Sequence, residues 1–111
     1  AHYLIDFRGY YLVWSTVVDA PLTSGLSETL CIEHMTWHNG LDMAEIIQIM
    51  LASQQGNPVQ IRNLKIGLQV KQESNEAFMK YNRAGEDEQC ISLDEIFYRY
   101  CDERGNNVRK H

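Results

Sequence analysis

The sequence has no apolar run near the ~20 residues that a membrane-spanning helix needs. Its first residues lack the basic region and apolar block of a secretion signal. The three cysteines are odd in number and unevenly spaced, which argues against a disulfide framework and favours a reducing compartment. We therefore expect a cytoplasmic protein that does not enter a membrane.

Catalytic signatures are also missing. The chain contains no GxSxG, HExxH, P-loop or GxGxxG pattern, and no repeat or low-complexity segment. With 111 residues, 44% of them hydrophobic and 23% charged, it has the size and composition of one ordinary globular domain. We expect a single domain over 1–111, with a frayed tail at 104–111.

Basic residues are fewer than acidic ones and are unevenly distributed along the chain. The net charge is −5, and residues 1–57 carry Arg8 as their single basic residue against six acidic ones. Residues 58–83 carry five basic residues against two acidic ones, and 84–103 carry seven acidic residues against one basic. This basic segment is too sparse for a nucleic-acid footprint. The acidic run at 86–95 either imitates a phosphate backbone for a basic partner or is a solvated loop and helix start.

The N-terminal segment HYLIDFRGYYLVWS predicts an aromatic β-hairpin with Arg8 and Gly9 at its tip. Side chains alternate between the two faces of a strand, so the pairing places six residues on one face. These six residues are Tyr3, Ile5, Phe7, Tyr10, Leu12 and Trp14. A lone hairpin is marginal in water, so we expect this face to pack on the rest of the chain.

The other face of the hairpin is a candidate binding surface. It offers Leu4, Tyr11 and Val13, with Val17 just beyond, among polar neighbours that suit partial exposure. Aromatic and other amphipathic side chains of this kind are enriched at protein interfaces. The alternative is that a third strand and the helices cover both faces. An exposed edge strand could also pair with its symmetry mate to build a homodimer.

Four helices follow from capping signals. Ser27 and Gly40 bound a helix through Asn39, and Asp42 with Glu45 forms a capping box for the next. The second helix has an apolar stripe at helical spacing, expected to face inward: Met43, Ile46, Ile47, Met50 and Leu51. Ser74 begins a third helical stretch, with Ala77, Phe78 and Tyr81 inward and Gly85 just past its end. Ser92 begins the last helix.

Leu64, Ile66, Leu68 and Val70 alternate with polar residues or glycine, a period typical of a third strand over 64–71. Together with the hairpin and about four short helices, this predicts an α+β fold in two layers.

Cys31, His34 and His38 share a narrow stripe on the first predicted helix. Thiolate and imidazole are ligands that zinc prefers, with water, Cys90, Cys101 or Glu33 available as a fourth. A thiolate–imidazolium pair for cysteine-dependent catalysis is a further reading. The same stripe also reads as the packing side of the helix, with Cys31 as a small apolar residue and the histidines satisfied in the core.

The segments YYLVWSTVVDAPLTSGLS, YNRAG (81–85) and ISLDEIFYRYC (91–101) resemble small phage and prophage proteins. The resemblance covers the two ends of the chain and carries no activity with it. It implies a phage-type accessory protein that acts inside a bacterial cell by binding a host or phage macromolecule. We therefore expect a non-catalytic protein that binds another protein. The alternative is a small zinc metalloprotein that uses Cys31, His34 and His38.

Overall fold

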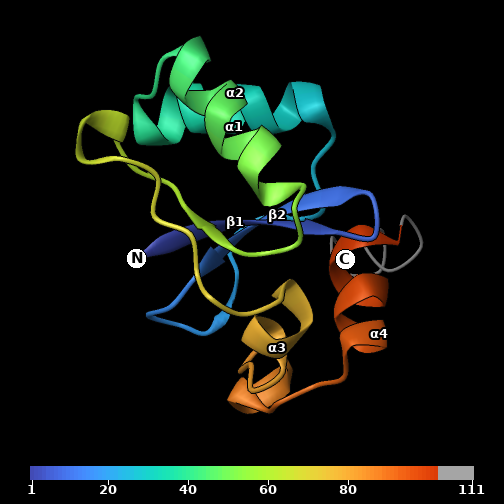
Figure 1. Ribbon diagram of the computed structural model, residues 1–111. Coiled ribbons are helices and arrows are strands. Elements are labelled where there is room, and N and C mark those ends of the chain that lie inside the picture. The colour runs from blue at the N-terminus through green and yellow to red at the C-terminus, as the bar shows by residue number, and fades with distance from the viewer. Residues whose placement is uncertain (103–111) are drawn as a thin grey trace.

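The computed structural model describes residues 1–102 and contains one antiparallel sheet with helices on both of its faces (Figure 1). The sheet has four strands in the order β3-β2-β1-β4. Its centre is the hairpin of β1 (His2–Phe7) and β2 (Tyr10–Ser15). Two-residue strands, β3 (Ala20–Pro21) and β4 (Val59–Gln60), flank the hairpin. The α+β class predicted from the sequence is confirmed, whereas the predicted tail at 104–111 lies outside the described residues.

The hairpin has the predicted register. Its Cα pairs include Tyr3 with Trp14, Ile5 with Leu12 and Phe7 with Tyr10. Arg8 and Gly9 at the tip both have positive φ, 50° and 89°, as in the type I′ turn whose twist matches the strands. The Arg8 guanidinium lies 5.0 Å from the centre of the Phe7 ring and 2.7 Å from a carboxylate oxygen of Asp94. The turn is thereby tied to the last helix.

Helices α1 (Glu28–Asn39) and α2 (Met43–Ser53) begin and end where their capping residues predict. The Ser27 hydroxyl accepts a hydrogen bond from the third amide of α1, and Gly40 ends α1 with φ of 65°. Asp42 and Glu45 form the predicted capping box, with distances of 2.9 and 3.2 Å. These caps satisfy amide groups that the first helical turn leaves unpaired.

Helix α3 (Asn75–Met79) is shorter than predicted, and α4 (Leu93–Ile96) continues into a π-helical turn, Phe97–Cys101. After α3 the chain forms a loop instead of continuing as a helix, and the Asn82 side chain holds this loop in place. Its amide nitrogen donates to the carbonyls of Met79 and Ile91, and its oxygen accepts from the N–H groups of Ala84 and Ile91. Tyr81, expected to face inward, is consequently 80% exposed. No helix within residues 1–102 is both long and apolar enough to cross a membrane.

The helices divide between the two faces of the sheet, which corrects the predicted two layers to three. Figure 1 shows α1 and α2 on one side of the hairpin and α3 and α4 on the other. One core joins hairpin residues to α1 and α2: Leu4, Tyr11, Val13, Cys31, Met35, Ile46 and Ile49. The other joins hairpin residues to the C-terminal helices: Ile5, Phe7, Leu12, Trp14, Met79, Ile96 and Tyr100. Both hairpin faces are apolar, so each needs its own cover.

The predicted strand at 64–71 is replaced by a 3-10 turn, Leu64–Ile66, and an extended segment after it. The turn forms because the Glu45 carboxylate accepts a hydrogen bond from the Leu64 N–H at 3.0 Å, and Asn63 caps the next residue. Farther along, Val70 forms an antiparallel bridge with Val59. We call residues 68–71 the edge segment.

Candidate functional site

The predicted hairpin surface is largely buried. Leu4, Tyr11 and Val13 lie beneath α1 and α2, and none of them is more than 6% exposed. Val17 is 73% exposed but stands beyond the end of β2. The prediction that these four residues form one binding surface is therefore wrong, because α1 and α2 cover the face that was expected to stay partly open.

Tyr11 shows how tightly this face is closed. Its hydroxyl accepts a hydrogen bond of 2.7 Å from the side-chain amide of Gln54, which follows α2. Burial raises the pKa of Tyr11. The missed signal is the uninterrupted apolar run over Tyr11–Trp14, since strands buried on both faces are apolar without alternation.

The three predicted zinc ligands differ in burial: Cys31 is buried, whereas His34 and His38 are not. Cys31 is fully buried in the core beneath α1, where burial raises the pKa of its thiol to about 12. Zinc ligands and cysteine nucleophiles act as thiolates, which this environment disfavours. Cys101 lies in the other core, and the exposed Cys90 thiol contacts the Lys80 carbonyl oxygen at 3.2 Å.

His34 and His38 do come together, with stacked rings whose centres are 4.4 Å apart. Burial, followed by the proximity of His38 and His2, lowers the pKa of His34. In the part of the chain that the structure describes, no three His, Cys, Asp or Glu side chains are placed to hold a metal ion together. The pair alone does not make the predicted three-ligand centre.

A groove between α1 and α2 is the strongest candidate binding site. We call it the α1–α2 groove; its volume is about 270 Å³. Its walls are apolar, with polar side chains at Glu28 and Gln54; the lining residues are Glu28, Ile32, Ile47, Met50, Leu51 and Gln54. Ile47 is 44% exposed and Leu51 is 56% exposed, while the neighbouring Met43 is 54% exposed. Three large apolar side chains on one helix thus face solvent at intervals of four residues.

These exposed residues belong to the stripe that the sequence predicts to face inward. The buried side of α2 is instead formed by Ile46, Ile49, Met50 and Ser53. Residues 46–61 contain no charged side chain, and residues 9–61 contain no lysine or arginine. A surface helix normally carries charge on its outer face. The α1–α2 groove therefore combines exposed apolar side chains with a weakly acidic surrounding.

The other flank of α1 carries a second small pocket of about 230 Å³. Its most prominent residue is Trp37, which is 80% exposed, and Leu30 beside it is 51% exposed. His34, His38, Glu33 and Leu26 complete the lining. Helix α1 thus has large exposed apolar side chains on this flank as well.

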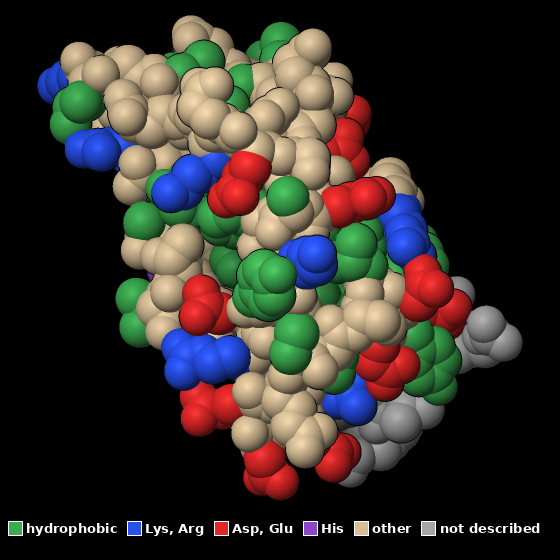
Figure 2. Space-filling view, turned by 60° about the horizontal axis from the view of Figure 1, so that its bottom comes forward, with side chains coloured by type: hydrophobic (Ala, Val, Ile, Leu, Met, Phe, Trp, Pro, Cys, Tyr) green, Lys and Arg blue, Asp and Glu red, His purple; other side chains and the backbone are tan. Residues whose placement is uncertain are grey.

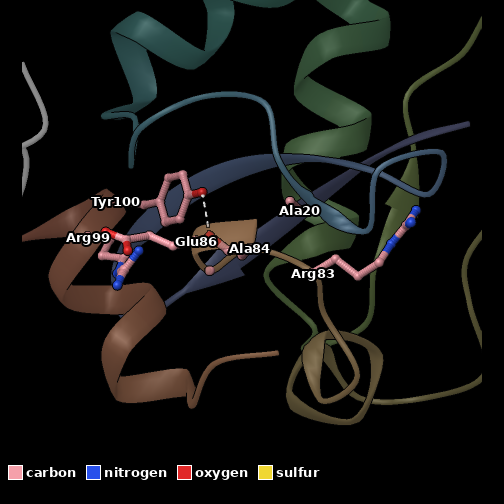
Figure 3. Close-up of a pocket in the computed structure, with 7 residues that line it drawn as sticks. Ala20, Arg83, Ala84, Glu86, Arg99 and Tyr100 are labelled. Carbon is pink, nitrogen blue, oxygen red and sulfur yellow. Dashed lines mark hydrogen bonds between the residues drawn. The ribbon is translucent and has the colours of Figure 1, made fainter. Parts of the chain in front are cut away.

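A larger pocket of about 480 Å³ lies at the C-terminal layer (Figure 3). Two of its lining residues, Arg83 and Arg99, could in principle attract an anion. Arg99 is already bonded to the Glu95 carboxylate at 2.8 Å. In Figure 3 the Arg83 side chain extends away from Tyr100, whose hydroxyl points to the Ala84 carbonyl. Among the described residues that line it, this pocket therefore lacks a cation without an acidic partner.

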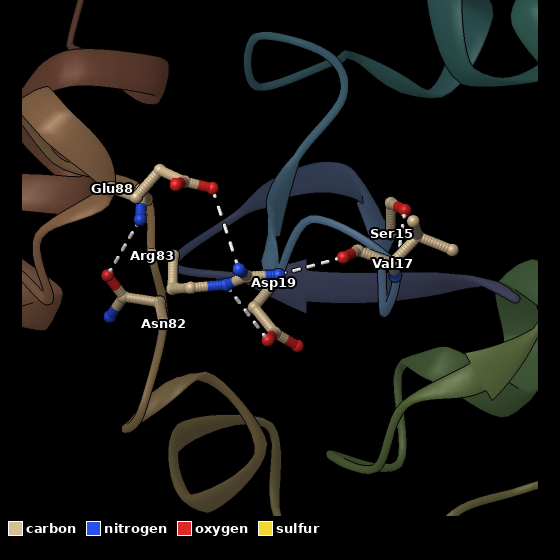
Figure 4. A network of polar contacts seen from close by, with 7 residues as sticks. Ser15, Val17, Asp19, Asn82, Arg83 and Glu88 are labelled. Atoms are coloured by element: carbon tan, nitrogen blue, oxygen red, sulfur yellow. Dashed lines mark hydrogen bonds and ion pairs between the residues drawn. The ribbon is translucent and has the colours of Figure 1, made fainter.

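Arg83 is held in a polar network of its own (Figure 4). It donates to the Val17 carbonyl at 2.8 Å and pairs with the carboxylates of Asp19 and Glu88 at 3.3 and 3.5 Å. Glu88 belongs to the acidic run considered above as a phosphate mimic, and Asp94 and Glu95 of that run pair with Arg8 and Arg99. These contacts favour the reading of a solvated loop and helix start.

The α3 side of the molecule looks different from the groove. Figure 2 brings that side forward and shows acidic and basic side chains interspersed, with hydrophobic side chains between them. Mixed charge of this kind is typical of a surface that faces solvent. No protein-family model, curated protein or solved structure matches the chain.

Proposed function

We propose that this protein acts by binding another protein through the α1–α2 groove, without a catalytic step. The observation that carries the proposal is the outward stripe of Met43, Ile47 and Leu51 beside a groove of about 270 Å³. Exposed apolar side chains grouped on one element typically mark an interaction site. The phage-type origin and the bacterial cytoplasm stay predictions, supported by the resemblance of the chain ends.

The partner element that fits best is an amphipathic helix with basic residues beside its apolar side. An apolar groove between two helices accepts side chains at helical spacing. Glu28 at the rim has no ion-pair partner within residues 1–102, and neither does Glu33 on α1. Since residues 9–61 supply no cation, positive charge on the partner would complement the groove and steer association.

The test places a photoreactive amino acid at Ile47 and, in a matched control, at Tyr81 in the opposite layer. Tyr81 is more exposed than Ile47, so nonspecific crosslinking would give at least as strong an adduct from position 81. In bacterial cells we expect an adduct from position 47 alone, which the added substitution Leu51→Lys removes. Mass spectrometry of the adduct should map the crosslink to a basic amphipathic helix.

Equal labelling at both positions, or no adduct at position 47, would overturn the proposal. An adduct of twice the chain mass would assign the groove to a second copy of this protein. This result would also overturn the proposal that the groove binds a different protein. Thermal unfolding of Leu51→Lys provides the folding control, because a substitution at an exposed position changes stability by about 0.5 kcal/mol or less.

A further inference from the structure

The edge segment leaves one side of the sheet open. Val70 lies directly opposite Val59 of β4, and hydrogen bonds of 2.8 and 2.9 Å join Gln69 and Lys71 to the backbone on either side of Val59. In this antiparallel pattern the N–H and C=O of Val70 itself point away from β4. Within residues 1–102 neither group has a hydrogen-bond partner. The same holds for the backbone of Leu68, two residues earlier.

The side chains of the edge segment have the pattern of a strand that pairs on both sides. Val70 and Leu68 are 40% and 42% exposed, and they alternate with Gln69 and Lys71. Directly opposite residues share a face of the sheet. Val70 therefore points to the same face as Val59, which packs in the core beneath α1 and α2.

The opposite edge of the sheet is closed. Strand β3 ends at Pro21, which has no N–H to offer a further strand. The chain after it continues along β2, where Leu22 donates to the Val13 carbonyl and Leu26 bridges Tyr11. Proline, lysine and short strands are common protections of a sheet edge. The edge segment is short and carries Lys71, but it has no proline and nothing within residues 1–102 pairs with its outer side.

Charge defines the kind of strand that this edge accepts. Of the lysine and arginine side chains within residues 1–102, Arg8, Arg83 and Arg99 are ion-paired. The remaining four have no ion pair there, and all belong to residues 62–80: Arg62, Lys65, Lys71 and Lys80. The open edge thus belongs to the segment whose basic side chains have no ion pair within residues 1–102, in a protein that is acidic overall.

We propose that the edge segment binds an extended, acidic segment of another protein as an additional antiparallel strand. Main-chain hydrogen bonds provide the affinity of such strand addition, and alternate side chains provide its specificity. A second copy fits less well, because two basic edges would then meet. This contact is separate from the α1–α2 groove and does not rest on the proposed function.

The geometry specifies the peptide. The residue opposite Val70 shares its face, so it should be apolar, and its own N–H and C=O should point toward Val70. The peptide residues on either side of this apolar residue lie on the face of Lys71, where their carboxylates would be close to its ammonium group. A short fluorescein-labelled peptide of alternating valine and glutamate has this pattern. Fluorescence anisotropy should show it binding at least about tenfold more tightly than the valine–lysine peptide at low salt, with the difference shrinking as salt screens the charges.

Two modified peptides test the main-chain bonds directly. Methylation of the valine nitrogens removes donors that face Val70 and should abolish binding. Methylation of the glutamate nitrogens alters the outward side and should leave binding nearly unchanged. Equal affinity of the two methylated peptides, or no binding of the unmodified peptide, would overturn the proposal.

Variants of the protein supply the matching evidence. Val70→Pro removes an N–H that bonds to nothing within residues 1–102, so the fold should persist, as thermal unfolding can verify, while affinity falls about tenfold or more. Lys71→Glu should reverse the preference toward the valine–lysine peptide, whereas Lys80→Glu, directly after α3, should alter it far less. Ile47→Lys should leave peptide binding intact, which separates this site from the groove.

Unchanged peptide binding by Val70→Pro would contradict the proposal. A concentration-dependent dimer in sedimentation velocity that Val70→Pro abolishes would assign the edge to a second copy and would likewise overturn it.

Discussion

The two helical layers cover the same hairpin but present very different outer surfaces. The α1–α2 layer consists of helices of 12 and 11 residues and exposes Met43, Ile47 and Leu51. The α3–α4 layer consists of shorter helices, and its surface carries ion pairs of Arg8, Arg83 and Arg99.

This difference shows that a layer can have long, regular helices and still expose large apolar side chains on its outer surface. The short C-terminal elements cannot be stable alone, and their loops are held by side-chain hydrogen bonds such as those of Asn82. The longer α1 and α2 pack on the hairpin through Met35, Ile46 and Ile49, and their outer side carries exposed apolar residues. The exposed apolar side chains of the first layer are the reason that we place the proposed helix-binding groove there.

Core truncation gives the largest expected effect and tests whether both layers contribute equally. Ile46→Ala and Ile96→Ala each remove a fully buried side chain, one from each layer. Each should lower the free energy of unfolding by about 2–5 kcal/mol, measured by urea denaturation. If Ile96→Ala cost less than about 1 kcal/mol, the C-terminal layer would not share the cooperative core.

Asn82→Ala should have an intermediate effect that is specific to the C-terminal layer. Asn82 is 2% exposed, and its removal leaves buried backbone groups of Ile91 and Met79 without partners. We expect a loss of about 2–3 kcal/mol in urea denaturation. The control Asn57→Ala removes two hydrogen bonds from a more exposed position and should cost about 1 kcal/mol. Equal losses would show that burial of Asn82 is unimportant.

The smallest expected effect is a difference in how often each layer opens locally. Thiol labelling measures this difference. Cys31 and Cys101 are buried in different cores, and burial raises the pKa of their thiols to about 12 and about 11. Both therefore stay protonated below those pH values and react only when their layer opens. In a Cys90→Ser background we expect iodoacetamide to modify Cys101 before Cys31, because the C-terminal elements are shorter. The reverse order, measured by mass spectrometry of peptides, would contradict this comparison.

Local signals were sufficient for much of the fold. The parity of the hairpin and the caps at Ser27, Asp42, Ser74 and Ser92 act over a few residues, so they can be read from the sequence. Strands β3 and β4 have two residues each, too few to show a period. The turn at Leu64 depends on Glu45, 19 positions earlier in the chain, and no local pattern announces it.

The candidate site was harder to predict because part of the apolar stripe on α2 faces solvent, whereas such a stripe normally faces the core. Apolar periodicity on α2 indicates a core-facing stripe, yet Ile47 and Leu51 point outward. The absence of charge over 46–61 is visible in the sequence and could have drawn attention to α2. The positions of Leu4, Tyr11 and Val13 were predicted wrongly because the hairpin pattern does not show which face α1 and α2 cover.

The hairpin that both cores share has a consequence for synthesis. It emerges from the ribosome before either of the layers that cover it. Helices α1 and α2 follow within the next segment, but the face with Ile5, Phe7, Leu12 and Trp14 receives its cover only when residues up to Cys101 have been made. At about 5–20 residues per second, the roughly 50 residues between the two layers take about 2–10 s. For that interval the nascent chain presents one aromatic sheet face to the cell, and a chaperone that shields such a face would act on this protein during translation rather than after it.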